Sequence, residues 1–404
     1  MRRFLRMSYL VAAVGGLGFF AMSMLLLGVL PGRALEEQIR QTSPAHPLVL
    51  SASEQRGRNV YSAAGCAYCH SQQIRYISSD VQRLGKATLA WETIFDYPHL
   101  WGTRRIGPDL SREAMVRTAD WQYAHLYAPR NIVGDSVMPA FPWLFDGAPD
   151  QPKQDAQDLV AYLETLGRDR ALAGPEGEAQ ALKACNCSDD ERRFAFGKGP
   201  LNASPAMARR KGTYPLLTVS SDDSHARRLY ARNCAGCHGA GGKGDGPGAA
   251  GLHPKPANFS DHEYALDRLS QALWNGVAGT AMAGWRDVPK EDLAAMASVV
   301  KGFYTAQPEP ALPPDLLETG RQVYAGHCAQ CHGETGAGDG SAADQFPVPP
   351  ANFQTQRPSI AASLRALRNG IEGTPMAPWT GQLSEAELSA AAYFVRGFYK
   401  GGQK

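Results

Sequence analysis

Three segments of the sequence place two cysteines and a histidine at the same spacing. The pattern Cys-x-x-Cys-His occurs at Cys66, Cys69 and His70, at Cys234, Cys237 and His238, and at Cys328, Cys331 and His332. Two thiols one helical turn apart can add to the two vinyl groups on one edge of a porphyrin, and the histidine that follows is then placed under the iron. The pattern is therefore typical of covalent haem c attachment.

Two other kinds of site share part of this pattern. A thioredoxin-like redox pair also uses Cys-x-x-Cys, but it does not require the histidine, and it is expected within a βαβ unit, for which the strand signals here are weak. A zinc site would need a complementary pair of ligands within each unit, and the second and third units contain no further cysteine. Three copies in helical surroundings favour three covalently bound haem c groups, each holding an iron ion.

A methionine occupies one shared position in the second and third units. Met282 and Met376 each follow the proximal histidine by 44 residues, in the segments GTAMAGW and GTPMAPW. A lone methionine is more often a core residue than a ligand, and Met296 is an example because its repeat equivalent is an alanine. In the first unit Met115 and Met138 are both candidates. Met138 is favoured because it lies in the proline- and aromatic-rich turn DSVMPAFPWL.

Histidine and methionine together predict an iron that carries electrons. This ligand pair raises the reduction potential and leaves no open coordination position, so no catalytic residue is predicted. The carbonyl groups near Pro108, Pro256 and Pro350 are candidate acceptors for the outer imidazole nitrogens. The expected iron ligands are His70, Met138, His238, Met282, His332 and Met376.

Other residues with chemical potential are given plainer roles. Gly239, Gly241 and Gly244 spell the dinucleotide-binding pattern G-x-G-x-x-G, but no strand precedes them, so a glycine-rich loop is expected. His99 and His125 are expected to be surface or hydrogen-bonding residues, because a methionine is available as the ligand. For Cys185 and Cys187 a mutual disulfide, free thiols and a metal site all remain open.

The composition and one apolar run indicate an exported, membrane-tethered protein. Of its 404 residues 44% are hydrophobic and 20% charged, and the net charge of +2 gives no electrostatic case for binding nucleic acid. Residues 8–30 are apolar and uncharged, and at about 1.5 Å per residue they span roughly 34 Å, enough for a bilayer core of about 30 Å. This run is longer than the apolar part of a signal peptide and lacks a clean cleavage site, so a retained anchor is expected.

Basic residues set the expected orientation of this anchor. Arg2, Arg3 and Arg6 precede the run, and Glu36 and Glu37 follow it. The positive-inside rule therefore places the N-terminus in the cytoplasm and the haem units on the periplasmic side of a bacterial inner membrane.

The second and third units form an internal repeat with a step of 94 residues. This step relates Cys234 to Cys328, Asn258-Phe259 to Asn352-Phe353 and Trp285 to Trp379 without a gap. The first unit differs. It is expected to begin with a helix capped near Ser53 and to end with a helix over 157–168, whereas Asp315 and Glu318 predict a capping box at the start of the third unit.

An all-α chain is predicted, with one N-terminal transmembrane helix. Its expected parts are a membrane anchor at 1–31, a monohaem domain at 32–168, an irregular connector at 169–222, a second cytochrome domain at 223–306 and a third at 307–404. Each unit should contain a helix, the cysteine motif, a long irregular loop, a methionine-containing turn and a C-terminal helix.

Four segments of the first unit carry a family resemblance. GRNVYSAAGCAYCHSQQIR, DYPHLWGTRRIGPDLSRE, DWQYAHLYAPRNIV and SVMPAFPWL resemble the FixO (CcoO) subunit of C-family, cbb3-type haem–copper oxidases, over residues 8–168. The resemblance implies that Cys66 and Cys69 anchor a haem with His70 and Met138 as its axial ligands. The two repeats are similar to the paired class I cytochrome c domains of the FixP (CcoP) subunit.

Together these resemblances imply a fused FixO–FixP-like subunit of a respiratory chain. It would relay electrons from a soluble cytochrome c or another periplasmic donor to a polytopic haem–copper catalytic subunit that reduces O2, and it would hold no active site of its own. Two departures stand out: FixP proteins carry their own membrane segment, and Gln73 stands where many FixO sequences have methionine. The alternatives are the same role in a nitric oxide reductase, the tri-haem subunit of a membrane-bound dehydrogenase, and, least favoured, a haem peroxidase.

Overall fold

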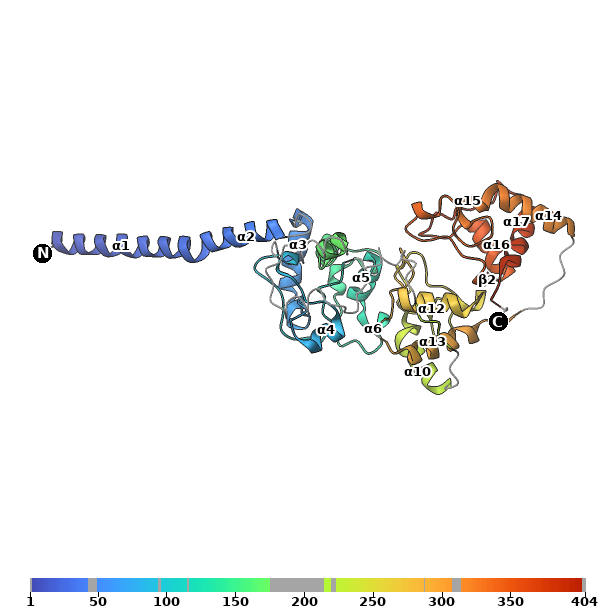
Figure 1. Ribbon diagram of the computed structural model, residues 1–404, viewed down its shortest axis with the longest axis horizontal. Coiled ribbons are helices and arrows are strands. Elements are labelled where there is room, and N and C mark those ends of the chain that lie inside the picture. Colours follow the sequence, from blue (N-terminus) through green and yellow to red (C-terminus); the bar gives the residue numbers. More distant parts are fainter. Residues whose placement is uncertain are drawn as a thin grey trace.

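The computed structural model describes residues 2–42, 49–93, 96–114, 116–174, 214–218, 223–286, 288–306 and 314–401. Within these ranges the structure is helical, apart from two paired strands of three residues each, and the all-α prediction is confirmed. A long N-terminal helix leads into three successive units, which we call the first (49–174), second (214–306) and third (314–401) unit (Figure 1). Met115, Cys185 and Cys187 lie outside the described residues.

The N-terminal helix has the length and surface of a membrane span. Helix α1 (Arg2–Met24) continues through a π-helical turn (Leu25–Val29) into α2 (Leu30–Thr42), and it projects away from the three units (Figure 1). Its apolar side chains are exposed, and none of its most apolar stretch is buried against the rest of the described chain. A helix that is apolar all round and has no protein neighbours is suited to lipid.

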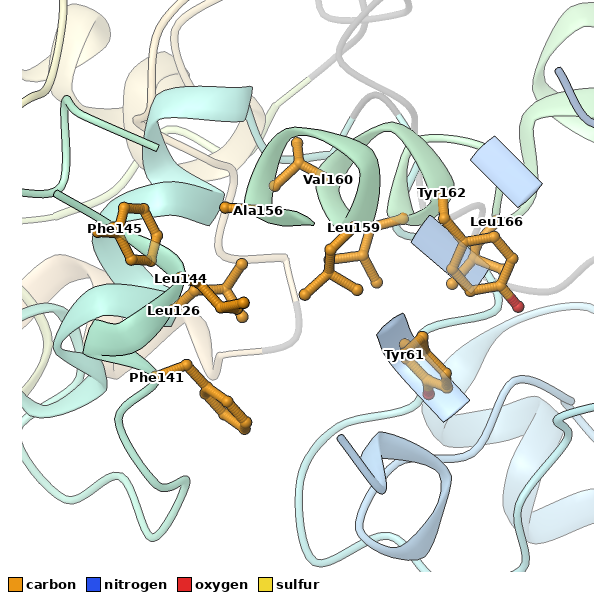
Figure 2. Close-up of a cluster of buried hydrophobic side chains, with 11 residues drawn as sticks. Tyr61, Leu126, Phe141, Leu144, Phe145, Ala156, Leu159, Val160, Tyr162 and Leu166 are labelled. Atoms are coloured by element: carbon orange, nitrogen blue, oxygen red, sulfur yellow. The ribbon is translucent and has the colours of Figure 1, made fainter. Parts of the chain in front are cut away.

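Two crossing helices form the centre of the first unit. Helix α3 (Ala52–Ala63) packs across α7 (Gln154–Leu163), and Figure 2 shows side chains of α7 pointing toward Tyr61 of α3. The helices approach most closely at Gly57, where an added Cβ would lie 1.8 Å from the carbonyl oxygen of Asp158. The close crossing therefore depends on the absence of a side chain at Gly57.

The predicted helix starts were partly wrong. Helix α3 begins at Ala52 and is capped by Ser51, which forms a capping box with Glu54, whereas the predicted cap Ser53 donates its hydroxyl to Asp158. In the third unit Glu318 binds the side chains of Arg321 and Gln322 and forms no capping box. A sequence offers several hydroxyl and carboxyl groups near a helix start, and tertiary partners decide which of them becomes the cap.

Short elements connect the two long helices of the first unit. They are a 3-10 turn (Cys66–Tyr68), α4 (Ser78–Leu84), a 3-10 turn (Ala90–Glu92), α5 (Ala119–Tyr127), α6 (Pro129–Ile132) and a 3-10 turn (Pro142–Leu144). Ion pairs hold the loop after the first cysteine motif. The guanidinium groups of Arg75 and Arg105 each lie 2.8 Å from Asp80 Oδ2. These charged contacts hold the irregular segment in place, alongside buried apolar side chains such as Ile74 and Trp91.

The second and third units share one arrangement. The second contains α10 (Asp223–Asn233), α11 (Ala235–His238), a 3-10 turn (Phe259–Asp261), β1 (His262–Tyr264), α12 (Leu266–Asn275) and α13 (Lys290–Phe303). The third contains α14 (Pro314–Val323), a π-helical turn (Tyr324–Cys328), α15 (Ala329–His332), a 3-10 turn (Ala343–Gln345), β2 (Gln356–Pro358), α16 (Ile360–Asn369), α17 (Glu385–Phe394) and a 3-10 turn (Val395–Phe398). In both units the first and last long helices pack together, as α3 and α7 do.

The two repeats dock on each other through equivalent segments. Strands β1 and β2 pair antiparallel with Glu263 opposite Arg357, and these two residues are one repeat step apart. The flanking bonds are reciprocal, because Ala265 N donates to Thr355 O at 2.8 Å and Ser359 N donates to Asp261 O at 2.6 Å. The same surface of each repeat therefore faces the other across a local two-fold axis, as in an isologous dimer.

Candidate haem-binding sites

Each motif histidine is held by one ring nitrogen. Nδ1 of His70 lies 2.9 Å from Pro108 O, and Nδ1 of His238 and His332 lies 3.1 Å from Ala257 O and Ala351 O. With the Nδ1 proton donated to a carbonyl group, the other nitrogen, Nε2, is left with its lone pair available for a metal ion. The predicted acceptor was correct in the first unit. In each repeat the acceptor is the alanine that follows the predicted proline, Pro256 or Pro350.

The surroundings of the imidazole rings distinguish the repeats from the first unit. In the repeats a phenylalanine ring stacks on the histidine, with centroids 4.4 Å apart for Phe259 and His238 and 4.8 Å apart for Phe353 and His332. In the first unit the ring of His70 rests on Gly107, where an added Cβ would lie 2.3 Å from its Cε1. Burial lowers the pKa of all three imidazoles, against the backbone contacts that raise it, which favours the neutral, metal-binding form.

The glycine-rich loop after the second motif packs against that motif, as the sequence predicted. Gly239 follows the histidine at φ +76°, and its carbonyl oxygen accepts a hydrogen bond of 2.8 Å from the hydroxyl of Tyr230. Gly242, at φ +70°, leaves room for the ring of Phe303, from the closing KGFY segment. The third unit repeats the first contact, with Tyr324 donating to Gly333 O at 2.7 Å.

The motif cysteines are half-buried, and four of them have a raised thiol pKa. Burial raises the pKa of Cys66, Cys237 and Cys328 to about 11 and that of Cys234 to about 12, and none of the six motif cysteines forms a disulfide. Reactive redox cysteines have a lowered pKa in electropositive surroundings. No cluster of three or more His, Cys, Asp or Glu side chains able to hold a metal ion occurs in the described parts of the chain. These thiols therefore suit thioether formation better than redox exchange or zinc binding.

All three candidate methionine ligands lie in the same hydroxyl-capped turn. The backbone N–H of Met138 donates to Ser136 Oγ at 3.2 Å, that of Met282 to Thr280 Oγ1 at 3.1 Å and that of Met376 to Thr374 Oγ1 at 3.2 Å. In each case the residue bearing the hydroxyl also donates its own N–H to the carbonyl three residues earlier. The sequence of the first unit differs from that of the repeats here, yet the same two backbone hydrogen bonds surround Met138.

Two of the three methionines also share a core cluster with a motif cysteine. Met138 and Cys66 pack against the core of the first unit, and Met282 and Cys234 pack against that of the second. Met296 is completely buried and its Sδ lies 3.8 Å from Cys234 Sγ, so it is a core neighbour of the attachment site, as predicted. Sequence inspection missed Ser136, Thr280 and Thr374, although a hydroxyl residue two positions before each methionine was visible.

The remaining histidines of the first unit have aromatic partners. His99 stacks on Trp101 with centroids 4.2 Å apart, and His125 stacks on Trp121 at 4.7 Å. Nδ1 of His125 is buried and has no hydrogen-bond partner in the structure. An unpartnered buried nitrogen beside the first motif is expected where a bound group would complete the pocket.

The donor set of each unit therefore fits haem c. The residues that would hold it are two thiols for the porphyrin edge, a neutral imidazole nitrogen and a thioether sulfur. Bound there, haem c would supply a one-electron couple.

Comparison with known proteins agrees with this assignment. The family model described as "Cytochrome C oxidase, mono-heme subunit/FixO" matches residues 5–170, and the model described as "Cytochrome C oxidase, cbb3-type, subunit III" matches residues 221–298 and 315–395. The chain is 27% identical over 178 residues to the cbb3-type cytochrome c oxidase subunit FixP of Azorhizobium caulinodans, which covers 41% of this chain and 56% of that protein. It is 25% identical over 186 residues to the subunit CcoP of Azospirillum brasilense, covering 42% and 59%. The chain thus spans less than two thirds of the length of these curated relatives.

Proposed function

We propose a function from the family membership of this chain, which belongs to the FixO family over residues 5–170 and to the cbb3-type subunit III family over residues 221–298 and 315–395. It is a membrane-anchored electron-transfer subunit of a cbb3-type oxidase. It carries three covalently bound haem c groups and relays electrons from a soluble periplasmic donor to the haem–copper catalytic subunit, where O2 is reduced. The observation that carries this proposal is the threefold occurrence of one ligand set, with a carbonyl-held imidazole and a methionine in a hydroxyl-capped turn.

The chain's own residues confine each site to electron transfer. The carbonyl acceptors at Pro108, Ala257 and Ala351 orient the imidazoles, and the capped turns fix the methionine backbone. With haem c bound, the imidazole and the methionine of each site would both be available to the iron, which disfavours a peroxidase because its iron needs an open position. A rigid ligand set also keeps the reorganisation on oxidation and reduction small.

Features of the first unit support an orientation of the chain relative to the membrane and a docking site for the catalytic subunit. The helix α1–α2 precedes this unit in the chain, which supports the first site as the one nearest the membrane (Figure 1). Large apolar side chains in this unit are exposed, among them Tyr68 of the first motif at 79%, Ile106 at 58% and Trp143 at 63%. Exposed apolar side chains near a redox site suit docking on a partner protein. We assign these exposed side chains to contact with the catalytic subunit and the third unit to contact with the soluble donor, all on the periplasmic side.

Purification of the chain in mild detergent tests the proposal. The expected result is co-purification with a polytopic subunit that holds b-type haem and copper, and three haem c groups per copy of this chain. Non-haem iron in place of copper would identify a nitric oxide reductase as the partner. Recovery of the chain alone, without b-type haem, or with fewer than three haem c groups, would overturn the proposal.

A further inference from the structure

Helix α5 packs against both the first and the second unit. One side of α5 packs on the core of the first unit through Leu126, Tyr123 and Tyr127, beside Cys66 and Met138. The other side carries Trp121 and Ala124 into a separate cluster that also includes Ile132 of α6. That second cluster contains Leu252, Ala281 and the motif cysteine Cys237, all from the second unit. The two candidate haem pockets are therefore separated by little more than one helix.

The second cysteine motif is shaped to seat against the first unit. An added Cβ at Gly236 would lie 2.7 Å from the carbonyl oxygens of Asn131 and Ile132, and one at Gly248 would lie 2.5 Å from Ile132 Cδ1. The repeat equivalents in the third unit are Gln330 and Ala342. Glycine thus occurs in the repeat that is docked, at positions where the other repeat carries a side chain.

Polar contacts fix the register of this docking. The backbone N–H of His253 donates to Asp120 Oδ2 at 2.9 Å, and Arg232 pairs with Asp135 at 2.8 Å. Asp120 lies in the first turn of α5, one residue before Trp121. The ion pair is exposed and contributes little energy, so the close backbone packing at Gly236 is the main constraint on the docked position.

Two stacked aromatic rings lie one turn apart on α5, the helix that contacts both units. The rings of Trp121 and His125 are 4.7 Å apart with planes 10° from parallel, and the guanidinium of Arg117 lies 4.5 Å from the centre of the Trp121 ring. Trp121 packs on the cluster that holds Cys237, while Nδ1 of His125 is buried without a partner. Burial, and then the charge of Arg117, lower the pKa of His125 to about 4, so this ring is neutral at pH 7.

We propose that the Trp121–His125 stack, held by the seating of Gly236 on α6, is the contact through which the first and second haem sites exchange electrons. This rests on the proposed function, since it requires haem c at both motifs. In the exchange one electron leaves the reduced iron of the second site and reduces the oxidised iron of the first, and no bond or proton moves. Trp121 and His125 act as positioning residues that fill the gap between the two sites.

This contact also fixes the order of the relay. The second unit touches the first through α5 and α6, and it touches the third through the two-fold pairing of β1 and β2. Figure 1 shows the second unit lying between the other two. In the part of the chain that the structure describes, electrons that enter at the third unit would reach the first by way of the second.

Exchanging the motif residues between repeats tests the seating. Gly236→Gln gives the second motif the residue of the third, so haem attachment should persist, and Gln330→Gly is the matched control at the exposed motif. In the purified complex, we expect Gly236→Gln to speed amide hydrogen exchange in α5 and α6 and to slow reoxidation by O2 of the second and third haem c groups, with the first unaffected. Gln330→Gly should change neither. Unchanged reoxidation in a Gly236→Gln complex that carries all its haem would overturn the proposal.

Substitution of the stack tests the side chains themselves. Trp121→Leu should slow the same phase of reoxidation without altering the midpoint potentials or the haem content, and Trp121→Phe should restore much of the rate. Loss of haem from the unsubstituted chain would instead refute the proposed function, so the two failures are distinguishable. A Trp121→Leu variant with the rate of the unsubstituted protein would show that the stack is only a packing contact.

Discussion

Replacing the four informative methionines by leucine, one at a time, tests the ligand assignment most selectively. Leucine has nearly the volume of methionine, and such swaps in a packed site cost less than about 1.5 kcal/mol, so each variant should fold and bind haem. Leucine cannot coordinate iron. Met138→Leu, Met282→Leu and Met376→Leu should therefore each open the sixth position of one haem.

Met296→Leu is a stringent control for these three variants. Its sulfur lies 3.8 Å from Cys234 Sγ and the residue is fully buried, so it is as near to an attachment site as a core methionine can be. Each ligand variant should convert one haem from six-coordinate, low-spin to five-coordinate, with carbon monoxide binding to that haem alone. Its midpoint potential should shift by a substantial part of the roughly 0.8 V range over which axial ligands act.

Absorption spectra and potentiometric titration of the purified complex measure these changes. Met296→Leu should leave all haem c spectra and potentials unchanged. If Met138→Leu left the first haem six-coordinate with its original potential, Met138 would not be its ligand, and Met115 would be the next candidate. A change in Met296→Leu as large as in Met282→Leu would show that packing near the haem, and not coordination, controls the signal.

Three further predictions concern the scaffold. Gly57→Ala should destabilise the first unit by about 1–3 kcal/mol in chemical denaturation, because its Cβ would overlap Asp158 O. Gly302→Ala, with open space around it, should be neutral or stabilising in the same assay. Equal effects of the two substitutions would contradict the close crossing of α3 and α7. Tyr324→Phe should cost about 1 kcal/mol in the same assay by leaving Gly333 O without its donor, and an unchanged denaturation midpoint would show that water replaces the hydroxyl. Hydrogen bonds, chiefly from Arg56, lower the pKa of Asp158 to about 2 from its ordinary value near 4. Because the folded pKa is the lower one, the carboxylate stabilises the fold above about pH 4 and ceases to do so as the pH falls toward 2. The difference in unfolding free energy between wild type and Asp158→Asn should therefore shrink over that range. A difference that stays constant with pH would show that ionisation of Asp158 does not contribute to stability.

The sequence identified the chemistry because that chemistry is local. Cys-x-x-Cys-His fits within one turn of backbone, and the structure presents it in three similar turns. The 94-residue repeat pointed to Met282 and Met376 together, and the two lie in identical turns. The helical class followed from periodicity, since the closing helices α13 and α17 bury apolar side chains at helical spacing.

What the sequence could not supply depends on contacts between distant segments. The cap of α3 is Ser51 because Ser53 is engaged by Asp158, 105 residues away. The two-fold pairing of Glu263 with Arg357 and the seating of Gly236 on α6 join separate units. The sequence shows Gly236 in one motif and Gln330 in the other, but only the packing of the units gives a reason for the difference.

We propose that this chain is a three-haem relay that delivers electrons to an oxygen-reducing partner subunit. Anaerobic reduction of the purified complex, followed by addition of O2 in a rapid-mixing spectrophotometer, tests it most directly. The account predicts that three haem c groups per chain become reduced and that O2 reoxidises all three. Fewer than three reducible groups, or any group that stays reduced after O2 is added, would contradict it.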